Sequence, residues 1–209
     1  SKNCIQGKEC RSTKKILTFF NNKLSVTQKA AITFILVILT GAFLLTLPVA
    51  SSEGTSTPFI NALFTSASAS CVTGLIVYDT FTHWSLFGQT VILVLIQIGG
   101  LGLMSAIYMI FFVRNKNLGL KEKELVRESF SPPSLMGVKE LSKTIILGTA
   151  FFEFLGALLL SVRFIPEFGL FRGIFYSVFH SISAFCNAGF DLMGIKQPGS
   201  SLNLYYDDI

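Results

Sequence analysis

The chain has 209 residues, 51% of them hydrophobic and only 14% charged, and its net charge is +5. Soluble domains carry about 25% charged residues, so this composition excludes an ordinary soluble domain. Residues 1–29 are polar and basic and contain no apolar core of a secretory signal. Because the chain starts with Ser rather than Met and stops at Ile209 without a terminal feature, we expect a fragment of a longer protein.

Three apolar segments are long enough to cross a bilayer as helices, which takes about 20 residues. They run roughly over residues 30–49, 86–113 and 145–164. Two further apolar stretches, residues 58–69 and 171–185, are too short to cross. Such lengths are typical of re-entrant or interfacial segments, and the Pro at the start of the first suits the first turn of a helix.

The basic residues alternate with the spans. Seven Lys or Arg residues precede the first span, none lies between the first and second, and seven lie between the second and third. This pattern predicts a multi-pass cell-membrane protein with a cytoplasmic N-terminus, whose two short segments enter from outside. A nucleic-acid-binding surface would not be split by hydrophobic spans, so no nucleic-acid partner is expected.

An internal repeat relates the two halves of the chain. An offset of 115 residues places residues 41–45 on 156–160 and residues 64–75 on 179–190, without a gap. In the longer pair, six of twelve positions are identical. One offset covers a spanning helix and the short segment after it, so the predicted unit is an outer helix, a pore helix, a loop and an inner helix.

The repeat predicts an all-α membrane protein with one complete and one partial unit. The expected organisation is a cytoplasmic N-terminal tail (residues 1–28), a first unit (29–113), a cytoplasmic linker (114–144) and a second unit (145–209) that stops before its inner helix.

Each pore helix is followed by an uncharged loop, residues 71–74 (C-V-T-G, the first loop) and 186–189 (C-N-A-G, the second loop). A helix that enters from outside ends within the membrane with partial negative charge, which favours a cation. The final Gly allows backbone angles closed to other residues, so several carbonyls can face one axis. Because Mg²⁺ and Ca²⁺ prefer carboxylates, the loops favour a weakly hydrated monovalent cation.

Three motifs carry a family resemblance: F-T-S-A-S-A-S-C-V-T-G-L at residues 64–75, Q-I-G-G-L-G at 97–102, and H-S-I-S-A-F-C-N-A-G-F-D at 180–191. Over residues 29–194 the chain resembles the Trk/Ktr/HKT superfamily of potassium transporters, in particular the bacterial Ktr-type membrane subunit. In that family, four potassium-channel-like units surround one pore.

The resemblance implies a potassium-uptake pore whose selectivity filter is lined by Val72, Thr73, Gly74, Asn187, Ala188 and Gly189. The residues that flank this filter would be Cys71, Leu75, Cys186 and Phe190. The transported ion would be K⁺, with Na⁺ as a candidate coupling ion, and no cofactor or resident metal is implied. The implied partners are the lipid bilayer, a second copy of the full-length protein and a cytosolic nucleotide-binding regulatory subunit.

Two acidic residues and two cysteines lie close to the loops. Asp79 and Asp191 follow the loops at the expected pore mouth, where they would raise the local cation concentration or simply be solvated loop charges. Cys71 and Cys186 lie on the outer side and could form a disulfide. Because they occupy equivalent positions in different units, we expect small-residue packing instead.

Three features inside apolar segments have competing interpretations. The glycines of residues 99–102 lack the spacing of a dinucleotide site, which favours close helix packing behind the filter. Glu153 lies within a span, but its repeat mate is Ile38, which favours pairing with a polar group of the neighbouring pore helix over a place in a symmetric ion path. His180, whose mate is Thr65, is expected to pack rather than to sense pH.

The sequence predicts a transporter and not an enzyme, because no nucleophile–base set or metal constellation lies in the spans. The alternative is a membrane scaffold that uses re-entrant loops only for structure. The repeat favours transport, since a scaffold has no need of Cys-x-x-Gly after both short helices.

Overall fold

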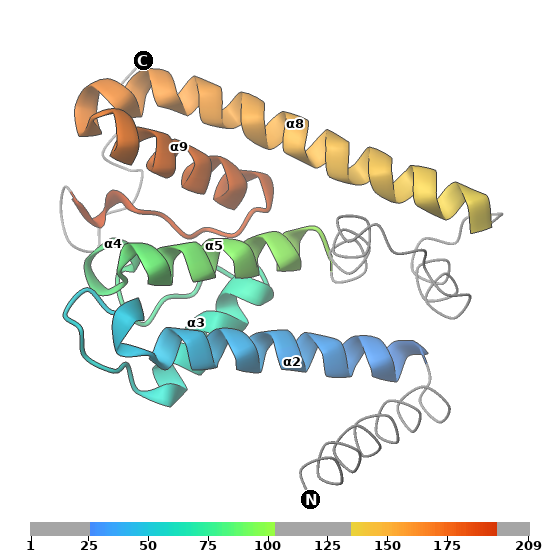
Figure 1. Cartoon of the computed structure of the whole chain (residues 1–209), viewed down its shortest axis with the longest axis horizontal. Helices are drawn as coiled ribbons and strands as arrows, with labels where there is room; N and C mark the ends of the chain where they lie inside the picture. Colours follow the sequence, from blue (N-terminus) through green and yellow to red (C-terminus); the bar gives the residue numbers. More distant parts are fainter. Residues whose placement is uncertain (1–25, 103–134, 196–209) are drawn as a thin grey trace, which may run out of the picture. The chain divides into compact units, whose positions relative to one another are not determined.

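A computed structural model of the chain describes residues 26–102 and 135–195 (Figure 1). Contacts divide the chain into two parts, residues 1–35 and residues 36–209. Every contact reported below lies within residues 36–209. The described residues form helices and no β-strand, which confirms the expected all-α class for this part of the chain.

The longer helices alternate with the short helices that the sequence predicts. In chain order they are α2 (Val26–Thr46), the 3₁₀ turn η1 (Pro48–Ala50), α3 (Phe59–Ser70), α4 (Thr80–His83), α5 (Leu86–Gly100), α8 (Leu135–Phe168), α9 (Leu170–Phe185) and η2 (Met193–Ile195). Helices α3 and α9, the expected pore helices, match the two short apolar stretches to within a residue at either end.

Helix α8 begins earlier than the predicted span, so it includes the end of the segment expected to be a linker. Within the described residues, one stretch of helix is long and apolar enough to cross a membrane, Lys143–Phe168. The apolar helical stretches Ala31–Thr46 and Leu86–Gly100 are shorter. The rest of the predicted second span, residues 103–113, lies outside the described residues.

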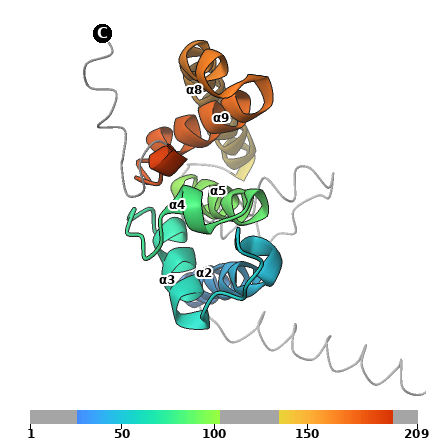
Figure 2. The same cartoon turned by 90° about the vertical axis from the view of Figure 1, so that its left-hand side faces the viewer.

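Helix α5 is the central element of the larger contact unit, residues 36–209. It packs against α3 and also contacts α9, which in turn runs beside α8 (Figures 1 and 2). The buried core includes the large side chains of Trp84, Ile92, Ile96 and Phe179, each no more than 1% exposed. Both α3 and α9 therefore pack directly onto α5.

Two local features direct the chain between helices. Ser85 caps α5: its hydroxyl accepts from the Gly88 N–H at 3.3 Å and donates to the Val49 carbonyl at 2.6 Å. Gly169 has φ of 83°, a left-handed value that glycine adopts readily, and this allows α9 to start directly after α8 ends.

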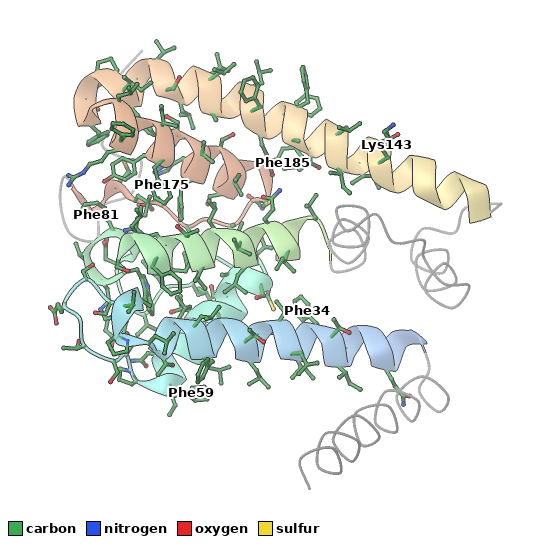
Figure 3. All side chains as sticks on the ribbon, viewed as in Figure 1. Phe34, Phe59, Phe81, Lys143, Phe175 and Phe185 are labelled. Atoms are coloured by element: carbon green, nitrogen blue, oxygen red, sulfur yellow. The ribbon has the colours of Figure 1, made fainter. Side chains whose placement is uncertain are left out.

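The side of α8 that faces away from α9 carries projecting apolar side chains (Figure 3). Phe151, Phe154, Leu159 and Val162 are each more than 60% exposed. Such a surface is unfavourable in water, because the apolar area of these side chains stays in contact with the solvent.

Candidate functional site: two helix-ending loops

The first loop ends α3 in a strained conformation. The Thr73 N–H bonds the Ser68 carbonyl at 3.0 Å and the Val72 N–H bonds the Ala69 carbonyl at 3.2 Å, the two bonds of a Schellman motif. This motif needs a left-handed residue, and Val72 occupies it with φ of 56°. For a β-branched residue that angle is an outlier, which costs on the order of 1–3 kcal/mol.

The second loop repeats this geometry at the end of α9. The Ala188 N–H bonds the Ser183 carbonyl at 2.7 Å, and the Asn187 N–H bonds the Ala184 carbonyl at 3.0 Å. Asn187 takes the left-handed position with φ of 56°, the same value as Val72. Asn tolerates this conformation better than Val, so the strain is larger in the first loop.

The two loops meet at their glycines. Gly74 and Gly189 both have positive φ, 70° and 75°. A Cβ added to Gly74 would lie 2.6 Å from the Ala188 carbonyl oxygen and 3.2 Å from the Gly189 Cα. A Cβ on Gly189 would lie 3.4 Å from the Gly74 Cα. The structure thus brings Gly74 of the first loop against Ala188 and Gly189 of the second, more than a hundred residues away in sequence.

Helix α5 supports both loops through adjacent glycines. A Cβ on Gly99 would collide with the Ser70 carbonyl oxygen and come within 3.1 Å of a Val72 methyl group. A Cβ on Gly100 would collide with the Cys186 thiol. The close packing expected for the glycines of residues 99–102 is confirmed for Gly99 and Gly100, which meet the C-terminal ends of α3 and α9, but not for Gly102, which has nothing in the described part of the chain within 4 Å of an added Cβ.

A serine also ties α3 to α2, and another ties α9 to α8. The Ser66 hydroxyl donates to the Ile38 carbonyl at 2.7 Å, and the Ser181 hydroxyl donates to the Glu153 carbonyl at 2.6 Å. The two bonds are related by the 115-residue offset. Both serines also face a glycine at that offset, since a Cβ on Gly41 or Gly156 would lie 2.5 Å from the serine oxygen. The identity of these serines in the repeat could have revealed this role from sequence.

The Glu153 side chain has a polar partner, but not on a pore helix as expected. Gln97 of α5 donates its amide N–H to both carboxylate oxygens, at 2.8 and 3.1 Å. Helix α9 binds the Glu153 backbone carbonyl through the Ser181 hydroxyl. Gln97 begins the Q-I-G-G-L-G motif, but the sequence did not identify it as the partner of Glu153, since a partner in another unit leaves no periodic signal.

His180 is 4% exposed and uses both ring nitrogens. Nε2 accepts from the Leu192 N–H at 3.2 Å, so Nδ1 carries the proton and donates to the Tyr176 carbonyl at 2.7 Å. The ring therefore fixes the segment after the second loop to α9, in line with the expected packing role.

Both acidic residues bind nearby backbone. Asp79 caps α4 by accepting from the Phe81 and Thr82 N–H groups at 3.0 and 2.8 Å. Asp191 accepts from the Met193 N–H at 2.9 Å. These carboxylates thus have structural contacts that the sequence did not suggest. An influence on cations at a pore mouth stays a prediction.

The two loop cysteines have different surroundings. Cys186 is half-buried against Gly100, which matches the packing expected for it. Cys71 is exposed, so the same expectation for Cys71 is wrong within the described residues. Both are free thiols in this structure.

Comparison with known proteins gives one family. Residues 4–205 match the TrkH family, described as cation transport protein. The chain is 43% identical over 183 residues to the potassium/sodium uptake protein NtpJ of Enterococcus hirae, which covers 88% of this chain and 41% of the relative. It is 49% identical over 165 residues to the Ktr system potassium uptake protein B of Bacillus subtilis. This aligned region covers 79% of this chain and 37% of the relative. The chain thus spans about two fifths of the length of these relatives, and it belongs to the TrkH family of cation transport proteins.

Proposed function

We propose that the chain forms part of the pore of a potassium-uptake protein, and that backbone carbonyls of residues 72–74 and 187–189 coordinate the ion. The family is one of cation transport proteins rather than enzymes. Relatives at 43% and 49% identity are named for uptake of potassium, or of potassium and sodium. Na⁺ is proposed as a candidate coupling ion.

The observation that carries the proposal is the pattern of backbone angles in the two loops. In the first loop, Val72 and Gly74 have positive φ and Thr73 between them does not. In the second loop, Asn187 and Gly189 have positive φ and Ala188 between them does not. Alternation of this kind can turn successive carbonyls toward the same side, whereas in a regular strand neighbouring peptides face opposite ways. A Val held at positive φ is strain that a purely structural helix end does not require.

The surroundings of the loops support a monovalent cation. Neither loop contains a charged residue, and each follows the C-terminus of a helix, where the backbone carries partial negative charge. Carbonyl rings of this kind replace the hydration shell of K⁺ in known filters. The hydrogen bonds of Ser66 and Ser181 join pairs of residues that are related by the 115-residue offset, which supports two copies of one pore unit.

The exposed apolar face of α8 supports contact with lipid. We propose that the N-terminus and residues 114–144 are cytoplasmic and that α3 and α9 enter from outside. The full-length protein is proposed to be a homodimer with four pore units per subunit. A cytosolic nucleotide-binding regulatory subunit is its proposed partner.

The direct test is ion uptake by the full-length parent protein in cells that lack their own potassium-uptake systems. We expect saturable ⁸⁶Rb⁺ uptake that excess K⁺ inhibits. If the protein reaches the membrane in normal amounts but gives no uptake above empty-vector cells, with its regulatory subunit also expressed, the scaffold alternative is favoured.

A further inference from the structure

The side-chain pair Gln97–Glu153 joins the inner helix of the first unit to the outer helix of the second. Its donor and acceptors are 2.8 and 3.1 Å apart. The Gln97 carbonyl oxygen Oε1 is buried and has no hydrogen-bond partner within the described part of the chain. The carboxylate is thus the group that orients this amide.

Gln97 lies two residues before the glycines that support the loops. On α5, Gly99 faces the Ser70 carbonyl and the Val72 side chain, and Gly100 faces Cys186. Because glycine has no side chain, these contacts do not fix how α5 is rotated about its axis or how far it is shifted along it. Another group on α5 must therefore fix its position against the loops. Gln97 is the polar side chain of α5 closest to these contacts in sequence.

Glu153 lies on α8, the outer helix of the second unit. Its carbonyl accepts the Ser181 hydroxyl, five residues before Cys186 on α9. In the first unit Ile38 does the same with its carbonyl, so the shared backbone role needs no carboxylate. The carboxylate serves a contact that is particular to the junction between the units.

We propose that the Gln97–Glu153 hydrogen bond is a positioning element that sets the first loop against the second and so tunes ion selectivity. The pair acts through α5 and does not touch the ion. Interhelical polar contacts within membranes are short-range and directional, which suits them to fixing helix register. The inference rests on the proposed function, because it concerns the selectivity of the proposed filter.

The test compares four forms of the full-length parent protein: wild type, Gln97→Leu/Glu153→Leu, the exchange Gln97→Glu/Glu153→Gln, and Ser161→Ala. The double-leucine variant leaves no unpaired polar group, so it should fold. The exchange keeps one amide and one carboxylate. Ser161 is a control on the same helix, where its hydroxyl bonds the Leu158 carbonyl.

The measured quantity is the ratio of Rb⁺ to Na⁺ uptake at equal surface expression. We expect this ratio to fall about threefold in the double-leucine variant, the size of one interhelical hydrogen bond in a membrane. It should return toward the wild-type value in the exchange variant and stay unchanged in Ser161→Ala.

An unchanged ratio in the double-leucine variant would overturn the inference. So would an exchange variant as impaired as the double-leucine variant. Failure of the proposed function is a separate result, since the wild-type protein would then show no Rb⁺ uptake in the same assay.

Discussion

His83 lies in a small polar and aromatic cluster that follows the first loop. Its Nε2 is 3.0 Å from the Thr57 hydroxyl, and its ring stacks on Tyr78 with centroids 4.0 Å apart. Tyr78 in turn accepts from the Asn61 amide of α3 at 2.7 Å. The cluster thus ties the start of the first pore helix to the segment that leads into α5.

The surroundings of His83 predict a loss of stability in acid. Burial lowers the pKa of His83 below 6.5, and the Glu53 carboxylate opposes part of this effect. The unfolded chain therefore binds the proton more readily than the folded one, so this stability is present above 6.5 and is lost as the pH falls through the folded pKa. In detergent, the Tm should be lower at about pH 5 than at about pH 7.5.

The His83→Gln variant isolates this effect, because the amide keeps a partner for Thr57 but does not titrate. Its Tm should depend less on pH than that of the wild type over the same range. Glu53→Gln should deepen the loss in acid, since the carboxylate that favours protonated His83 is removed. Identical pH profiles for wild type and His83→Gln would contradict this account.

At the scale of elements, α5 depends on the absence of side chains where it meets the loops. Gly99→Ala places a methyl group against the Ser70 carbonyl, a backbone atom that can move only with the loop. Overpacking of this kind costs about 1–3 kcal/mol. We expect a lower Tm together with weaker Rb⁺ uptake in the full-length parent.

Gly148→Ala on α8 is the matched control, because nothing lies within 4 Å of its added Cβ. Alanine is a better helix former than glycine by up to about 1 kcal/mol, so this variant should be neutral or slightly stabilised. Equal effects of the two substitutions on Tm and on uptake would show that the Gly99 contact is not specific.

The short helices α3 and α9 could be predicted from sequence almost to the residue. Each is a short apolar run that ends at a loop, a Pro marks the start of the first, and the repeat identifies both loops at once. The contact of Gln97 with Glu153 could not be predicted, because it joins different units and follows no period. The length of α8 was missed since its first turns are polar, and hydropathy marks only the apolar part of a helix.

For the whole molecule, the proposed topology predicts opposite accessibility of two loops. With single cysteines introduced in a background without the native ones, Ser52→Cys should react with an impermeant maleimide in intact cells. Ser129→Cys should react only after permeabilisation. Ser52 is exposed in the structure, so its reaction is not blocked by packing. Labelling of both from the same side would contradict the arrangement of three spans.

The central claim is that the two loops form part of a potassium filter, and Gly74→Ser in the full-length parent tests it most directly. The serine Cβ would lie 2.6 Å from the Ala188 carbonyl oxygen, a proposed ligand, and would occupy a left-handed position that glycine favours. Gly54→Ser is the control, because Gly54 has a similar φ of 69° but open space around it. At equal surface expression, we predict that the ratio of Rb⁺ to Na⁺ uptake falls about tenfold in Gly74→Ser, equivalent to about 1.4 kcal/mol of selectivity, and is unchanged in Gly54→Ser. A wild-type ratio in Gly74→Ser would contradict the assignment of the filter.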